Sequence, residues 1–219
     1  MRREHHLVES VCVCEWSVEQ AIIGGSAHLL SFGGSDNMAA CYPAQYNLNN
    51  TVPVATSIPA TEHSVKTAWS DERKAIEQQI ENFSDKIFLG VMDSYDYDNA
   101  LDTILSSVAD SVSTRGGFLV IRSDSGDPVE QVVKGLKAAE KCFPTSVNSR
   151  GYKVIQGAVV LQGDGINYEN IREIQETVME SGFSAACVAY GMGGSLLQKV
   201  NPRHNVFCYK IVLHQGAQR

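Results

Sequence analysis

The chain has 219 residues, of which 43% are hydrophobic and 20% charged, and its formal net charge is -7 at pH 7. This length and composition suit the core of one globular domain better than two small ones. The negative charge argues against a broad nucleic-acid-binding surface or an acidic-membrane surface, so any anion must be bound in a local pocket.

The first residues and the cysteines favour a cytoplasmic protein. Residues 1–16 predict an irregular leader, and the charged residues at its start are followed by no apolar core of a signal peptide. The six cysteines lack the paired spacing of a zinc site, so we infer reduced thiols. No apolar run approaches the roughly 20 residues that a membrane-spanning helix needs. We therefore expect no insertion into a membrane.

A strand, a loop and a helix are predicted before residue 84. Residues 26–34 favour a short strand that leads into Asp36. Residues 42–59 contain three prolines and several asparagines, which predicts a long loop, and this loop closes on His63 and its neighbours. Residues 70–83 carry apolar side chains at helical spacing behind an acidic start, which predicts an amphipathic helix.

From residue 87 onward the chain repeats one pattern, an apolar strand followed by a polar loop and a helix. Strands are expected at residues 87–92, 118–121, 158–161, 185–189 and 206–213, and helices at 99–108, 128–142, 168–180 and from 195. Strands that alternate with helices imply a mainly parallel sheet with right-handed crossovers. About six such units favour a barrel-like α/β domain over a small open sheet, although closure of a barrel takes roughly eight in the standard case. The sequence therefore predicts a parallel, TIM-like barrel domain that is incomplete.

Polar side chains and glycines follow these strands at their C-terminal ends, the face on which α/β barrels carry their active sites. Arg122 and Asp124 follow one strand, Asp164 follows the next, and Gly193 and Gly194 follow the one after that. Glycines at such turns let backbone N–H groups approach a phosphate, with a tight turn that needs a positive φ as the alternative. Together with the neighbouring loops, phosphate binding is the better interpretation.

The aspartates at the strand ends have a functional and a structural interpretation. Asp124 and Asp164 are suited to accept hydrogen bonds from vicinal hydroxyls of a ribose, or to share a Mg²⁺ through water. An aspartate in such a loop often only caps a helix or forms a turn. We favour the functional interpretation for Asp124 and Asp164, and the structural one for Asp93 and Asp127.

Arg122 and His63 are the other charged candidates. The guanidinium of Arg122 suits a phosphate or an aromatic face, a salt bridge to a nearby aspartate is the alternative, and the two are compatible. His63 suits a base, a nucleophile or a metal ligand, although a lone histidine is more often structural. The residues alone leave these choices open.

Several stretches, taken in order, resemble the nicotinamide phosphoribosyltransferase family, which is similar to other type II phosphoribosyltransferases. The resemblance covers about residues 17–200 and rests on Ser26-Ala27-His28 with Gly34-Ser35-Asp36, residues 57–64, Asp93-Ser94-Tyr95-Asp96, Ile121-Arg122-Ser123-Asp124-Ser125-Gly126, Gln162-Gly163-Asp164-Gly165 and residues 193–199. It implies a divergent leader at residues 1–16 and a partial α/β-barrel catalytic domain at residues 17–219.

The resemblance implies an activity with its substrates. Members of this family transfer ribose 5-phosphate from phosphoribosyl pyrophosphate to nicotinamide, so we expect a glycosyltransferase of NAD biosynthesis that forms nicotinamide mononucleotide and pyrophosphate. The resemblance also implies Mg²⁺, without identifying its protein ligands, and ATP, which stimulates the reaction by phosphorylating a histidine. It further implies a homodimer in the full-length form.

The resemblance also assigns roles to particular residues. Asp36 would accept a hydrogen bond from the nicotinamide amide, and its carboxylate would repel nicotinate. His63, beside Glu62, would be the phosphorylated histidine and, with Asp124, a catalytic candidate. The remaining implied contacts are Arg122 with the nicotinamide and phosphate side, Asp124 and the pair Gly163 and Asp164 with the ribose and metal region, Gly193 and Gly194 with the 5′-phosphate, and Ser57 and Asp96 in the same pocket.

Two alternatives stay open at this point. The first is a related transferase that uses nicotinate, against which Asp36 argues. The second is a catalytically inactive fragment or pseudoenzyme, because family members carry a large N-terminal region, and a motif just before the position of Ser17, that are absent from this sequence.

Overall fold

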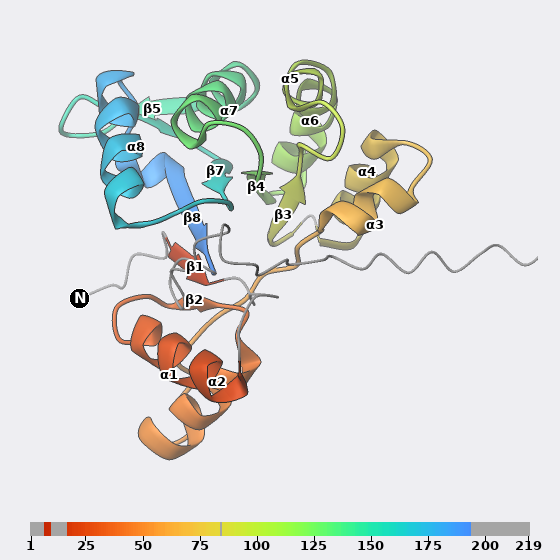
Figure 1. Cartoon of the computed structure of the whole chain (residues 1–219). Coiled ribbons are helices and arrows are strands. Elements are labelled where there is room, and N and C mark those ends of the chain that lie inside the picture. Colours follow the sequence, from red (N-terminus) through yellow and green to blue (C-terminus); the bar gives the residue numbers. More distant parts are fainter. Residues whose placement is uncertain (1–6, 10–16, 84, 194–219) are drawn as a thin grey trace, which may run out of the picture.

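The computed structural model describes residues 7–9, 17–83 and 85–193. Its centre is a six-stranded parallel sheet with the strand order β2-β1-β8-β7-β4-β3 (Figure 1). The strands are β1 (Leu7–Glu9), β2 (Gly34–Ser35), β3 (Ile87–Val91), β4 (Phe118–Ser123), β7 (Ala158–Gln162) and β8 (Val188–Met192). The predicted mixed α/β fold with a parallel sheet is confirmed.

Helices cover the outer face of this sheet and form the main core with it. They are α4 (Glu72–Phe83), α6 (Ser106–Thr114), α7 (Pro128–Cys142) and α8 (Tyr168–Glu180), arranged side by side around the strands in Figure 1. Buried strand residues such as Leu119, Ile121 and Val160 pack against helix residues such as Leu136 and Ile174. Since side chains alternate along a strand, the residues between them point to the other face.

The two helices with the clearest sequence signals begin and end as predicted. α7 begins at Pro128, and the Asp127 carboxylate accepts a hydrogen bond from the Glu130 N–H at 2.9 Å. α8 begins after Asn167, whose side chain caps the first turn, and Gly182 follows its end at a φ of 85°. The structural interpretation of Asp127 is therefore confirmed.

A short segment of the predicted loop at 42–59 links both edges of the sheet. The Thr56 N–H donates to the Gly33 carbonyl at 2.8 Å, which joins the segment to the β2 edge. Three residues on, the Leu89 N–H donates to the Pro59 carbonyl at 2.8 Å, which joins it to β3. The inner face of the sheet is thereby bounded by this segment as well as by the strands.

Residues 18–48 differ most from the prediction. Residues 26–34 are predicted to form a strand, but α1 (Val18–Leu29) occupies the first four of them, and only Gly34, at the end of the range, lies in a strand, β2. The Ser17 side chain caps α1, and packing against α2 (Met38–Pro43) outweighs the low helix propensity of its glycines. The predicted loop is also wrong at its start, because α2 continues into the π-helical segment η1 (Ala44–Leu48).

Smaller differences follow along the rest of the chain. The strand expected at 185–189 begins later, because a 3-10 turn, η3 (Ala185–Cys187), is capped by Ser184 and delays β8. The helix expected at 99–108 is longer and has three parts, α5 (Tyr97–Asn99), η2 (Ala100–Leu105) and α6. Four elements outside residues 18–48 were not predicted, namely β1 within the expected leader, α3 (His63–Ala68), and the antiparallel pair β5 (Thr145–Val147) and β6 (Lys153–Ile155). The expected helix from 195 and strand at 206–213 lie outside the described residues.

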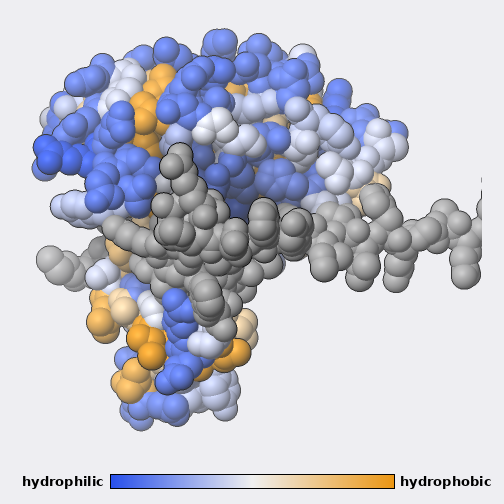
Figure 2. All heavy atoms as spheres, viewed as in Figure 1, coloured by the Kyte–Doolittle hydropathy of each residue, from blue (hydrophilic) through white to orange (hydrophobic). Residues whose placement is uncertain are grey.

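Helices α1, α2 and η1 form a lobe below the sheet that packs mainly on itself and on β2 (Figure 1). Apolar side chains gather on the surface of this lobe, as Figure 2 shows. Its exposed large apolar residues are Val18, Ile23, Leu30, Met38, Tyr42, Tyr46 and Leu48. Within the described parts of the chain, no helix has the length and apolar character needed to cross a membrane.

Candidate active site

A cavity of about 470 Å³ lies against the inner face of the sheet. Its walls are apolar and include Leu89, Val120 and Leu161, one from each of three neighbouring strands. Asp36, Thr56, Ser57 and Arg122 are the polar side chains among the described residues that line it. Asp36 follows β2 and Arg122 lies near the end of β4, so the polar groups collect at the C-terminal ends of the strands. A flat apolar ring with a polar substituent matches such a lining.

Asp36 and Ser57 meet at the cavity although 21 positions separate them. The Ser57 hydroxyl donates to Asp36 Oδ1 at 2.5 Å. Ser57 belongs to the segment that links the sheet edges, and Asp36 stands between β2 and the N-cap of α2, Asn37. The carboxylate is therefore held by its position in the chain and by one hydrogen bond, which leaves Oδ2 to accept a donor from a bound molecule.

Arg122 and Asp124 form a two-pronged ion pair at the end of β4. Arg122 Nε donates to Asp124 Oδ1 at 2.8 Å and its terminal nitrogen donates to Oδ2 at 2.9 Å. Gly163 lies so close that a Cβ at this position would overlap the Asp124 carboxylate and come within 2.8 Å of Arg122 Nε. The pair thus needs glycine at position 163, and the salt-bridge interpretation of Arg122 is confirmed.

Asp93 connects this pair to His63. Its side chain is only 2% exposed, and Oδ1 lies 3.1 Å from His63 Nε2. Asp93 Oδ2 accepts the Asp124 N–H at 2.7 Å and the Ser125 hydroxyl at 2.6 Å. One carboxylate therefore holds the loop after β4 and the histidine at the start of α3 (His63–Ala68).

The surroundings of Asp93 change its acidity. Burial by itself raises the pKa of the carboxyl, but the hydrogen bonds from His63, Ser125 and the Asp124 N–H outweigh it and lower the pKa to about 2. The ionised form is thus the one that the fold stabilises at neutral pH.

We expect this ionised carboxylate to stabilise the fold in a pH-dependent way. Because the folded pKa lies below the usual 3.8, the unfolded chain binds more protons between these values, and the stabilisation of about 2 kcal/mol is lost as the pH falls from 3.8 towards 2. Urea unfolding of the parent and of Asp93→Asn checks this. The difference in unfolding free energy between them should be largest above pH 5 and shrink at pH 3, and a constant difference would contradict it.

Five predicted site residues remain to be placed. Glu62 occupies the N-cap position directly before His63, and Asp164 is exposed in the loop after β7. Asp96 caps α5 by accepting the Asn99 N–H at 3.0 Å, and it is not among the residues that line the cavity. Gly193 ends the described part of the chain, and Gly194 lies outside it.

Asp93 and Ser125 are the residues that sequence reasoning missed. Asp93 was assigned a structural role, but the structure makes it the contact between His63 and the loop of Asp124. The available signal was its place directly after a strand, the same kind of position that singled out Asp124. Nothing local marks Ser125, because its partner lies 32 positions away.

The described residues contain no cluster of three or more histidine, cysteine, aspartate or glutamate side chains able to hold a metal ion. Both carboxylate oxygens of Asp93 and Asp124 already accept hydrogen bonds, which makes the exposed Asp164 carboxylate, in the loop after β7, a candidate oxygen ligand. Mg²⁺ commonly keeps several waters and binds through one or two carboxylates together with substrate phosphates. The residues fit that mode and not an all-protein cage.

Comparison with known proteins gives one consistent result. Residues 14–214 match the model of the nicotinate phosphoribosyltransferase (NAPRTase) family. A nicotinamide phosphoribosyltransferase of Xanthomonas campestris is 39% identical over 199 residues, which are 89% of this chain and 42% of that protein. One of Mycoplasma pneumoniae is 32% identical over 211 residues, or 89% and 44%. The chain thus spans less than half the length of the curated relatives it matches.

A solved structure from Saccharomyces cerevisiae, named a "putative nicotinate phosphoribosyltransferase", is similar with a TM-score of 0.57. The similarity covers 88% of this chain and 45% of the other at 18% sequence identity. At this level of sequence identity, the similarity shows a shared fold alone.

Proposed function

Because the chain belongs to the nicotinate phosphoribosyltransferase (NAPRTase) family, we propose that it carries the catalytic domain of a nicotinamide phosphoribosyltransferase. The reaction is the transfer of ribose 5-phosphate from phosphoribosyl pyrophosphate to nicotinamide, which gives nicotinamide mononucleotide and pyrophosphate in NAD biosynthesis. We propose that strands β2, β3, β4, β7 and β8 belong to a partial, TIM-like barrel domain at residues 17–219.

The observation that carries the proposal is the Asp36 carboxylate at the polar end of an apolar cavity. A pyridine ring fits between apolar walls, and its carboxamide N–H₂ is a donor that Asp36 Oδ2 accepts. Nicotinate has a carboxylate in place of this amide, and two neighbouring carboxylates repel each other. The arrangement therefore favours nicotinamide over nicotinate.

The ribose and its phosphates would occupy the loops beside Arg122. The Arg122 guanidinium gives two of its donors to Asp124 and keeps others for a phosphate. We assign the ribose hydroxyls and metal side to Asp124, Gly163 and Asp164, and the 5′-phosphate to the backbone at Gly193 and Gly194.

In the reaction the nicotinamide ring nitrogen forms a bond to ribose C1, and the bond from C1 to the pyrophosphate oxygen breaks with its electron pair leaving on pyrophosphate. The ribose is oxocarbenium-like between these events, so charge stabilisation matters more than proton transfer. We assign Asp124 to the side where positive charge would develop, and Asp164 is the carboxylate that would hold Mg²⁺ together with the phosphates. When bound, Mg²⁺ would neutralise charge on the leaving pyrophosphate.

We propose that ATP phosphorylates His63 and thereby drives the reaction. A neutral ring that donates its Nε2 proton to Asp93 carries its lone pair on Nδ1, which lies 3.9 Å from Asp124 Oδ2, and this lone pair would be the nucleophile. Attack on the γ-phosphorus forms the nitrogen–phosphorus bond, and the electron pair of the broken bond leaves with ADP. Glu62, at the neighbouring position, is assigned to the same site.

Supplying the purified chain with nicotinamide, phosphoribosyl pyrophosphate, Mg²⁺ and ATP tests this function. We expect nicotinamide mononucleotide as the product and, by calorimetry, binding of that nucleotide to the chain. If no product forms, and neither nicotinamide mononucleotide nor phosphoribosyl pyrophosphate binds, the proposal is contradicted and an inactive form is favoured. A faster reaction with nicotinate would establish the nicotinate-specific alternative.

Asp36→Asn should reduce the selectivity for nicotinamide over nicotinate. An asparagine no longer repels a carboxylate, so we expect the preference for nicotinamide over nicotinate, as a ratio of kcat/KM or of binding constants, to fall by about 100-fold. Asp98→Asn makes the same change at an exposed aspartate on α5 and should leave the ratio unchanged. An unchanged ratio in Asp36→Asn would remove Asp36 from the base site.

We also propose that the protein works as a homodimer in the cytoplasm. The apolar side chains exposed on the α1, α2 and η1 lobe support an association of this kind. Analytical ultracentrifugation of the purified chain measures it directly.

A further inference from the structure

Helix α3, which begins with His63, packs on the rest of the protein through a buried lysine as well as through the contact of His63 with Asp93. The helix has six residues, too few to be stable by themselves in water. Lys66 is its one buried residue and is 0% exposed, whereas Val65, Thr67 and Ala68 are exposed. Lysine is seldom fully buried unless it is paired, so its surroundings should explain why it anchors this helix.

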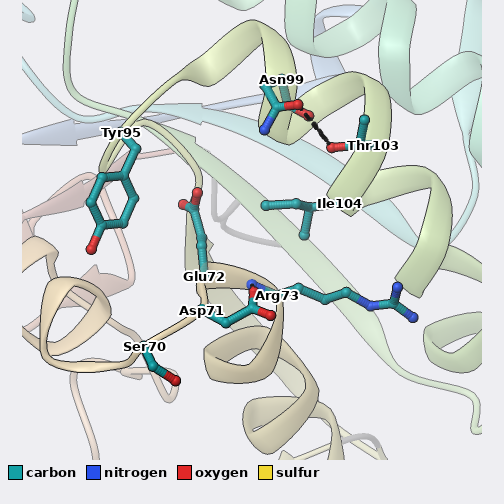
Figure 3. Close-up of a pocket in the computed structure, with 8 residues that line it drawn as sticks. All are labelled: Ser70, Asp71, Glu72, Arg73, Tyr95, Asn99, Thr103 and Ile104. Atoms are coloured by element: carbon teal, nitrogen blue, oxygen red, sulfur yellow. Dashed lines mark hydrogen bonds between the residues drawn. The ribbon is translucent and has the colours of Figure 1, made fainter.

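The partner of Lys66 is Glu72, the first residue of α4. Lys66 Nζ lies 4.0 Å from Glu72 Oε1, and neither atom has a hydrogen-bond partner within the described residues. Glu72 is mostly buried and projects into a hollow of about 450 Å³ that Tyr95 and Ile104 also line (Figure 3). The attraction between the two charges is therefore the polar contact that joins α3 to α4.

This ion pair lies next to the Asp93 centre. Burial lowers the pKa of Lys66 to about 8, against the opposing effect of Glu72. Burial also raises the pKa of Glu72, Lys66 lowers it, and the nearby Asp93 charge raises it further. Asp93 is the residue that holds His63 Nε2. A change of charge at Lys66 therefore acts on the helix that carries His63, and a change of charge at Glu72 acts on Asp93, the partner of His63.

We propose that Lys66 and Glu72 are positioning residues for His63, and that their buried ion pair seats α3 on the start of α4 so that the imidazole meets Asp93. Lys66 stands three positions after His63, and its N–H donates to the Glu62 carbonyl at 3.1 Å. A shift of the lysine therefore moves the first turn of the helix, where the histidine lies. The functional importance of this positioning rests on the proposed role of His63, but the contact between the His63 ring and Asp93 can be measured without substrate.

The test is the ¹⁵N NMR spectrum of the His63 ring in the full chain, which reports the nitrogen that carries the proton. Asp93→Ala, which keeps no acceptor at this position, supplies the reference for a ring released from Asp93. We expect Lys66→Met and Glu72→Gln each to move the ring signals most of the way towards that reference, because each leaves one buried charge without its partner. The double variant Lys66→Met/Glu72→Gln leaves no unpaired charge and should return the signals most of the way to the parent.

Glu77→Gln is the matched control, because it removes a carboxylate from the exposed Arg73–Glu77 pair on the same helix. It should leave the His63 signals unchanged. If Lys66→Met does not fold, Glu72→Gln decides the matter by itself.

Folded single variants with the parental His63 spectrum would overturn the proposal, as would a double variant as disturbed as the single ones. Loss of thermal stability without movement of the ring signals would show a purely structural pair, which also overturns it. A chain that shows the expected pattern but forms no nicotinamide mononucleotide contradicts the proposed function and leaves the positioning role supported.

Discussion

Replacing Asp93 by asparagine should lower the rate of the proposed phosphorylation of His63 by ATP about 100-fold or more, as expected when a histidine loses the carboxylate that sets its tautomer. Asp93 accepts from His63, from the Asp124 N–H and from the Ser125 hydroxyl. An asparagine has one acceptor oxygen and one donor group, so it cannot accept on both sides. The N–H₂ group of the asparagine then faces another donor, which is either the His63 ring or the N–H and hydroxyl groups of the Asp124 loop. Phosphohistidine formed from labelled ATP measures the effect.

Asp127→Asn is the control for this substitution. It also changes an aspartate in a strand-end loop, but asparagine caps a helix about as well as aspartate, so α7 should be unaffected. We expect the control to phosphorylate His63 at the parental rate. A parental rate in Asp93→Asn would show that its hydrogen bond to His63 has no part in the chemistry.

The parallel sheet and the outer helices were predictable because their signals are local. Pro128 and Asp127 mark the start of α7 within two positions, and a β-branched run marks β4. The lobe was not predictable in this way. Helix α1 contains Gly24 and Gly25, which lower helix propensity, and it forms because α2 packs against it.

The candidate site likewise combines contacts that are local in the sequence with contacts that only the fold creates. Arg122 and Asp124 pair across two positions at the end of one strand, so a reader of the sequence finds them together. Asp93 meets His63 across 30 positions, and only the fold reveals the contact. A lysine is expected on the surface, and the burial of Lys66 depends on Glu72 being brought to it by another helix.

Gly163→Ala should weaken binding of nicotinamide mononucleotide by about 100-fold, a loss of about 2.7 kcal/mol. A Cβ at this position overlaps the Asp124 carboxylate and crowds Arg122, and this carboxylate is not free to yield. It is held by two bonds from Arg122, and the Asp124 N–H is bound to Asp93. The pair must therefore open or shift as a unit, which displaces the guanidinium that we assign to the phosphate. Calorimetry with the nucleotide measures the loss.

Gly90→Ala separates this effect from the general cost of filling space in the sheet. Gly90 lies in β3, and a Cβ there meets its nearest neighbour, Gln79, at 3.6 Å, an ordinary contact. Neither glycine has a φ in the left-handed region, so backbone strain does not distinguish the two substitutions. We expect parental affinity in Gly90→Ala. Equal losses in both variants would show that the close approach of Gly163 to the Arg122–Asp124 pair has no particular part in binding, because crowding anywhere in the sheet would then have the same result.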